Sequence, residues 1–157
     1  MNKHFKLVLS LALMLGCVPP PAFADQPGKH PFYLHALADL RSARHNIVRA
    51  KGDAEVRWDE SRAISDIDAA IRKIKEAAID DGKNLDDRQP VDAREPYSGR
   101  LHRALAALKS AHDDVDREED NEFGHGLKRR ALQDIDNAMV RTREGLCNAG
   151  DKAFCPR

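Results

Sequence analysis

Histidine and aspartate side chains are the residues best suited to chemistry in this chain. His35 and His102 each follow a leucine near the start of a predicted helix, and Asp39 lies one helical turn after His35. Asp80 and Asp81 lie where another predicted helix ends. Two imidazoles and one or two carboxylates at one end of a bundle could bind Zn²⁺ or another divalent transition metal ion. We therefore expect a metal or small-ligand site where these five side chains meet.

The same histidines also have a simpler interpretation. A histidine at the end of a helical bundle is commonly a hydrogen-bonded boundary residue, and His35 with Asp39 forms an ordinary pair one turn apart. An internal repeat, described below, aligns His35 with Arg103 and not with His102. Ligands placed by symmetry are therefore not expected, and both interpretations stay open.

Motifs of other functional classes are missing from the sequence. It has no haem-attachment C-x-x-C-H, no P-loop, no dinucleotide fingerprint and no G-x-S-x-G. Glu122 and His125 have the spacing of a di-iron motif, but Gly124 and Gly126 beside them predict a loop. The 26 basic and 26 acidic residues argue against a nucleic-acid binder. We expect no enzyme, and no cofactor beyond the divalent metal ion.

The apolar pattern predicts four helices that must position these residues, over residues 31–50, 57–81, 98–118 and 126–147. In the second segment, isoleucines recur every three or four residues, which is the spacing of one helix face. No segment shows the alternation of a β-strand. The sequence thus predicts an all-α fold, an antiparallel up-down four-helix bundle over residues 31–157. We expect its first and third helices to start at the same end.

An internal repeat of 68 residues indicates that the bundle arose by duplication of a helical hairpin. Between residues 36 and 78, 14 of 43 positions are identical to the residue 68 positions later. The segment ALADLRSA at 36–43, for example, aligns with ALAALKSA at 104–111. The longest link, residues 82–97, joins the two hairpins. It is either a solvated linker or a loop that binds a ligand or partner.

The N-terminal residues 1–24 have the pattern of a secretory signal peptide. Basic residues precede a short apolar run, and Ala22-Phe23-Ala24 forms a small-residue cleavage site. The apolar run is too short for a transmembrane helix, and residues 25–30 would form a disordered N-terminus. The competing interpretation is a lipoprotein signal, in which Cys17 carries a lipid anchor. Either interpretation places the protein in the periplasm or outside a bacterial cell.

Export would also determine the state of the two remaining cysteines. Cys147 and Cys155 are eight residues apart and flank a segment that contains Gly150. Disulfides are the usual state of paired cysteines in oxidising compartments. The sequence therefore predicts a Cys147–Cys155 disulfide that closes a C-terminal loop.

Three segments resemble a family of small exported bacterial proteins that share an HPxYLHALxDLR sequence. They are HPFYLHALADLR at 30–41, AAIDDGKN at 77–84 and GRLHRAL at 99–105. The resemblance spans most of the chain after residue 24. It implies a helical bundle and carries no activity, so no functional residue is taken from it.

Two functions follow as expectations. The first is an exported binding protein that takes a divalent metal ion or a small ligand at the His/Asp-rich bundle end. The alternative is a non-catalytic structural or interaction module that meets another envelope protein through its charged helices or the 82–97 link. Histidines that converge would favour the first function, and histidines that are scattered and exposed would favour the second.

Overall fold

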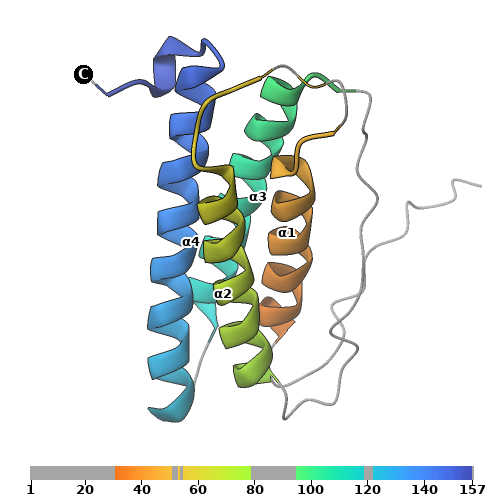
Figure 1. Ribbon diagram of the computed structural model, residues 1–157. Coiled ribbons are helices and arrows are strands. Elements are labelled where there is room, and N and C mark those ends of the chain that lie inside the picture. Colours follow the sequence, from red (N-terminus) through yellow and green to blue (C-terminus); the bar gives the residue numbers. More distant parts are fainter. Residues whose placement is uncertain (1–30, 51–52, 54, 79–94, 119–121, 157) are drawn as a thin grey trace, which may run out of the picture.

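The structure is a computed structural model that describes residues 31–50, 53, 55–78, 95–118 and 122–156, and these residues form a bundle of helices (Figure 1). The helices are α1 Pro31–Ile47, α2 Glu60–Ala78, α3 Tyr97–Arg117 and α4 Glu122–Asn148, followed by the short 3-10 helix η2 Lys152–Phe154. The described ranges contain no β-strand. The predicted all-α four-helix bundle is therefore confirmed. The predicted signal peptide and residues 25–30 lie outside the described part of the chain.

The start of α4 differs from the prediction. The helix begins at Glu122 and includes Gly124 and Gly126, so the loop predicted around His125 was wrong. Glycine costs about 1 kcal/mol inside a helix. Packing outweighs that cost here, because Leu127 is 3% exposed and begins the buried stripe of α4.

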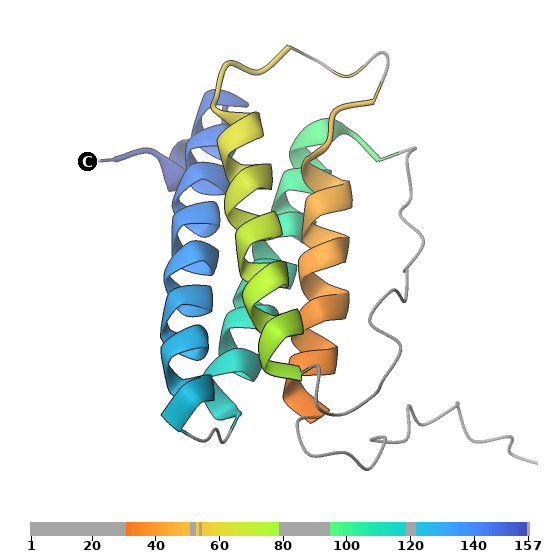
Figure 2. The same ribbon diagram turned by 60° about the horizontal axis from the view of Figure 1, so that its bottom comes forward.

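The directions of α3 and α4 also differ from the prediction. We call the end of the bundle where α1 starts the lower end, and the end where α1 finishes the upper end. In Figures 1 and 2, α1 and α4 run from the lower end to the upper end, and α2 and α3 run the opposite way. The first and third helices therefore start at opposite ends, and residues 79–96 connect the lower end of α2 to the upper end of α3.

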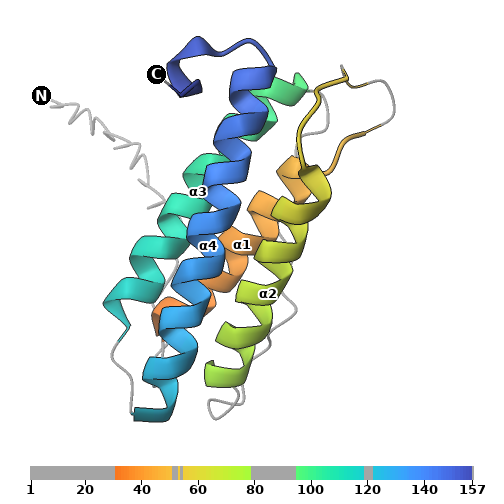
Figure 3. The ribbon, with the colours of Figure 1, turned by 60° about the vertical axis from the view of Figure 1, so that its left-hand side comes forward.

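Each helix is nevertheless antiparallel to both of its neighbours. α1 packs against α2 and α3, and α4 packs against α2 and α3. In Figure 3, α4 lies in front, between α3 on one side and α2 on the other. We refer to α1 with α2 as the first half and to α3 with α4 as the second half. The most extensive contacts are those between the halves, α1 with α3 and α2 with α4.

The buried residues follow the 68-residue repeat. Alanines alternate with larger aliphatic residues along each helix, which lets neighbouring helices approach closely. Equivalent positions of the two halves are both fully buried in the pairs Ala36/Ala104, Leu40/Leu108, Ala43/Ala111, Ile47/Val115, Ala63/Ala131, Ile67/Ile135 and Ala70/Ala138. None of the described helices is both long and apolar enough to cross a lipid bilayer.

Candidate functional site

The two histidines expected to share a metal ion lie at opposite ends of the bundle. His35 is in the second turn of α1, at the lower end, and His102 is in the second turn of α3, at the upper end. The Nε2 atom of His102 lies 3.1 Å from Oδ2 of Asp151, which follows α4. The structure therefore does not bring His35 and His102 together. The physical reason is that α2 ends at the lower end and α3 starts at the upper end, so α3 runs opposite to α1.

The carboxylates expected at that site are also separated. Asp39, on α1, lies near Asp114 of α3. Burial raises the pKa of the Asp114 carboxyl, the nearby His35 lowers it, and the charge of Asp39 raises it again. Asp80 and Asp81 lie outside the described residues. Within the described ranges, no group of three or more His, Cys, Asp or Glu side chains is placed to hold a metal ion.

The predicted disulfide is present and holds the C-terminal segment on the upper end. Cys147 and Cys155 are bonded, with Cα atoms 4.9 Å apart. The closed loop places Asp151 beside His102, and the ring of Phe154 meets the His102 ring edge-on with centroids 5.5 Å apart. The observed contacts of His102 match those of a boundary residue, which was the simpler interpretation.

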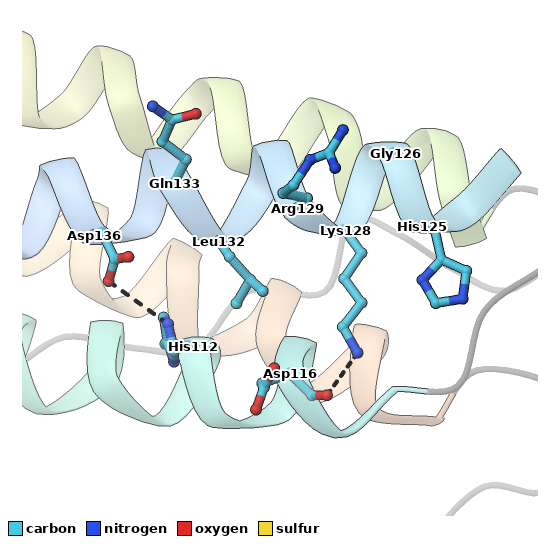
Figure 4. A pocket seen from close by; sticks show the side chains of 9 residues that line it. All are labelled: His112, Asp116, His125, Gly126, Lys128, Arg129, Leu132, Gln133 and Asp136. Carbon is cyan, nitrogen blue, oxygen red and sulfur yellow. Dashed lines mark hydrogen bonds and ion pairs between the residues drawn. The ribbon is translucent and has the colours of Figure 1, made fainter. Parts of the chain in front are cut away.

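A shallow groove of about 850 Å³ between α3 and α4 is the candidate binding site (Figure 4). It lies toward the lower end, where α3 finishes and α4 begins. Its lining residues are His112 and Asp116 from α3, and His125, Gly126, Lys128, Arg129, Leu132, Gln133 and Asp136 from α4. In Figure 4, the Leu132 side chain points from α4 toward α3 between two polar contacts. The groove therefore combines one apolar side chain with charged groups on both sides.

Two polar contacts that flank Leu132 join α3 to α4. The Nε2 atom of His112 lies 3.6 Å from Oδ1 of Asp136, and this contact is an ion pair only when the ring is protonated; Nδ1 of the same ring lies 3.8 Å from Oδ1 of Asp113. Lys128 Nζ donates to the main-chain oxygen of Asp116 at 2.6 Å, near the end of α3. The groove therefore has a polar contact between the two helices on each side of the leucine.

The internal repeat supplies a comparison for this groove inside the same chain. Eight of the nine lining positions carry another residue in the first half, where for example His112, His125 and Gly126 correspond to Arg44, Arg57 and Trp58. In the first half, Arg44 Nε donates to Oδ1 of Asp68 at 2.8 Å, and Asp68 is the equivalent of Asp136. The same helix–helix contact is therefore made by an arginine in one half and by a histidine in the other. The second half also lacks the indole.

The upper end is filled by a polar network that the sequence analysis did not anticipate. The hydroxyl of Tyr97 donates to the main-chain oxygen of Ile47 at 2.8 Å and accepts from Trp58 Nε1 at 3.2 Å. Burial raises the pKa of Tyr97 well above its usual range, and the negative charge of Glu60 raises it further. The signal that could have indicated this network is the single tryptophan, which stands just before a helix.

Arg100 ties the connection between α1 and α2 to the start of α3. Its side chain is only 3% exposed, and its guanidinium donates to the main-chain oxygen of Val48 at 3.0 Å and pairs with the Asp53 carboxylate. The guanidinium carbon also lies 5.2 Å from the centre of the Tyr97 ring. A buried arginine with these partners fixes the position of a loop, so we assign this cluster to the fold and not to a binding site.

Comparison with protein-family models, with curated proteins and with solved structures finds no significant match to this chain. The resemblance suggested by the HPxYLHALxDLR segment therefore stays a prediction.

Proposed function

We propose that this protein is an exported, non-catalytic binding module that takes a small polar ligand with an acidic group in the groove between α3 and α4. The observation that carries the proposal is the arrangement of His112, His125 and Lys128 around Leu132 in one groove of about 850 Å³. A volume of this order is typical of small-molecule sites. Leu132 would contact the apolar part of the ligand, and the basic groups would contact its acidic part.

The basic side chains of the groove offer partners for an anionic group. Lys128 and Arg129 carry positive charges, and the imidazoles of His112 and His125 can donate hydrogen bonds to an acidic group. His112 Nε2 lies 3.6 Å from Oδ1 of Asp136, which would hold its ring in place. Asp116 and Asp136 also line the groove and offer acceptors for polar donors of the ligand.

The repeat gives independent support for a site at this place. Some buried positions keep their residue, as Ile67 and Ile135 do, and others differ, as Ile74 and Thr142 do. At the groove the differences change the chemistry, because arginine is replaced by histidine at 112 and 125, and tryptophan by glycine at 126. The groove of the second half therefore presents side chains that the first half does not have at these positions.

A divalent metal ion and a protein partner receive less support. His35 and His102 lie at opposite ends of the bundle, so they offer no joint coordination site. Among the described residues, the exposed large hydrophobic side chains are Val48 and Val140, at 41% and 52% exposure. Two isolated valines do not form the contiguous apolar patch typical of a protein interface. We therefore favour the small ligand.

The proposed location outside the cytoplasm is supported by the disulfide, because structural disulfides persist in oxidising compartments. The signal peptide over residues 1–24 and the lipid anchor at Cys17 are two versions of this proposal. Mass spectrometry of the protein isolated from the cell envelope separates them. Cleavage after Ala24 gives an unmodified chain that starts at Asp25, whereas lipoprotein processing gives a chain that starts at a lipidated Cys17.

The ligand proposal is tested by NMR titration of the chain from residue 25. The probes are small carboxylates and phosphate esters. We expect amide shifts confined to residues around His112 and from 125 to 136.

Two tryptophan variants serve as matched tests of the groove. Gly126→Trp places in the groove the residue type that the first half has at this position, and it should abolish the shifts while the helical circular dichroism is kept. Val140→Trp adds the same ring at an exposed position elsewhere on α4 and should leave binding intact. Binding that survives Gly126→Trp, or no shift with any probe, would contradict the proposal.

A further inference from the structure

The two halves are joined by a pair of reciprocal ion pairs. Arg141 Nε on α4 lies 2.8 Å from Oδ2 of Asp66 on α2, and Lys73 on α2 pairs with Asp134 on α4. Asp134 is the repeat equivalent of Asp66, and Arg141 is the equivalent of Lys73. Each half thus supplies one acid and one base at the same two positions. The interface is related to itself by an approximate two-fold axis, as in a symmetric dimer.

The apolar part of the same interface is also self-complementary. Ala63, Ile67 and Ala70 of α2 are fully buried against the second half, and their equivalents Ala131, Ile135 and Ala138 of α4 are fully buried against the first. Some buried positions depart from this pattern. Buried Thr142 stands where the first half has Ile74, and its hydroxyl donates within α4 to the main-chain oxygen of Ala138 at 2.8 Å. Each half therefore buries its apolar face against a similar apolar face of the other half.

We propose that this interface also forms between two copies of the chain, which exchange halves to give a dimer. Each bundle of the dimer contains the first half of one copy and the second half of the other, with the contacts of the monomer reproduced. The core and the ion pairs lie between the halves, so the exchange replaces each contact by the same contact from the partner copy. Only the path of residues 79–96 changes.

The length of chain between the halves permits both forms. In the monomer, residues 79–96 must connect opposite ends of a bundle whose 19-residue α2 is about 28 Å long. Eighteen residues can span about 60 Å when extended. In a dimer with a two-fold axis perpendicular to the helices, the lower end of one bundle lies beside the upper end of the other. Each link then crosses only from one bundle to its neighbour.

The exchange of halves leaves the proposed ligand site intact, and the dimer contains two copies of that site. The groove is lined by α3 and α4 alone, and both belong to the second half. Each bundle of the dimer therefore keeps a complete groove. A dimer would offer two grooves on one particle and could hold a multivalent target more tightly than one groove does.

The first test shortens the link in the chain from residue 25. Deletion of residues 80–91 leaves six residues between α2 and α3, which span about 20 Å and cannot return along the bundle. We expect this variant to be a dimer by light scattering, with the helical content per residue of the wild-type chain. A folded monomer would overturn the proposal.

Refolding of the wild-type chain tests the proposal even if the shortened chain fails to fold. The halves of one chain meet at an effective concentration in the millimolar range. Dimer should therefore be a minor product of refolding at micromolar concentration and a major product as the concentration approaches millimolar. Monomer alone at every concentration would overturn the proposal.

Chemical cross-linking then identifies which contacts hold the dimer. Asp66→Cys with Arg141→Cys places thiols on the two halves, and a short bis-maleimide that joins them should link two chains in the dimer and one chain in the monomer. The matched control is Arg44→Cys with Asp68→Cys, a pair within the first half, whose bridge stays inside one chain in both forms. A dimer in which the 66–141 bridge stays inside one chain would overturn the exchange of halves.

Discussion

The backbone N–H of Tyr33, in the first turn of α1, donates a hydrogen bond to the side-chain carboxylate of Glu118, the residue that follows α3 (N···O 3.2 Å). The first turn of a helix has N–H groups without intrahelical partners and favours a negative charge. Glu118 is 85 residues away in the sequence and only 5% exposed. The end of the third helix therefore caps the start of the first.

Replacement of this carboxylate should weaken the bundle. Glu118→Ala removes the acceptor of a buried N–H, and we expect a loss of about 1–2 kcal/mol in the free energy of unfolding. Urea unfolding followed by circular dichroism measures this loss. Glu76→Ala, at an exposed position of α2, serves as the control and should change stability by less than about 0.5 kcal/mol. Equal effects of the two variants would contradict the capping role.

Gly145 lies directly under the ring of Trp58. A Cβ atom at this glycine would approach the ring to 2.9 Å, so Gly145→Ala must displace the indole. Although alanine favours helix by about 1 kcal/mol, we expect a net loss of about 1–3 kcal/mol from overpacking. Trp58 is the single tryptophan, so its fluorescence should report the displacement directly.

Gly126→Ala is the matched control for that experiment. The nearest atom to a Cβ at this helical glycine is the flexible end of Arg130, at an ordinary contact distance of 3.5 Å. This variant should gain up to about 1 kcal/mol from helix propensity. A gain of similar size in Gly145→Ala would show that the indole does not restrict the site.

The carboxyl group of Asp114 should make the protein less stable as the pH rises. Burial is the main cause of its raised pKa, so the folded state retains a proton that the unfolded state releases. Stability contributed by the protonated form is complete below the unfolded pKa of about 4 and is lost as the pH rises through the folded value. Asp114→Asn should therefore gain stability at pH 7, and because the carboxyl is partly exposed, solvent screening should keep the gain below about 1 kcal/mol. That gain should shrink toward zero on acidification below about pH 4. Unfolding curves at several pH values measure it, and a gain independent of pH would contradict this cause.

Reduction of the Cys147–Cys155 disulfide should release the C-terminal segment from the upper end of the bundle. Chain entropy for a loop of this length predicts that this segment becomes less stable by about 2–3 kcal/mol. We expect the NMR signals of the His102 ring to change on reduction, because Asp151 and Phe154 are held beside it. In Cys147→Ser with Cys155→Ser, the ring should already give the reduced spectrum and should not respond to the reductant. Unchanged His102 signals on reduction of the wild type would show that the disulfide does not hold Asp151 and Phe154 beside the His102 ring.

The sequence predicted the elements of the fold but not the direction of the second hairpin, α3 with α4. Periodic isoleucines and alanines define the buried face of each helix, and the 68-residue repeat defines two hairpins. Each hairpin is antiparallel in either topology, and the buried faces are the same. The direction of α3 depends on where the link 79–96 leads, and its composition does not determine this. The joint placement of His35 and His102 failed for that reason.

The candidate groove could be predicted only in part. The repeat alignment already contains the difference between Trp58 and Gly126, which is visible in the sequence. What it cannot give is the relative placement of α3 and α4, which brings His112 of one helix opposite Asp136 of the other. The cluster of Arg100 with Asp53 was missed for a similar reason, because its members are 47 residues apart in the chain.

Pro31, where α1 begins, and Cys155, which the disulfide holds near the end of α4, lie at opposite ends of the bundle. A force applied between these two points pulls α1 and α4 lengthwise in opposite directions. The two helices lie diagonally across the bundle, so the load passes through α2 and α3. Contacts along whole helices then share the load, instead of being peeled apart from one end. The bundle that positions the groove should therefore also resist a pulling force along its length.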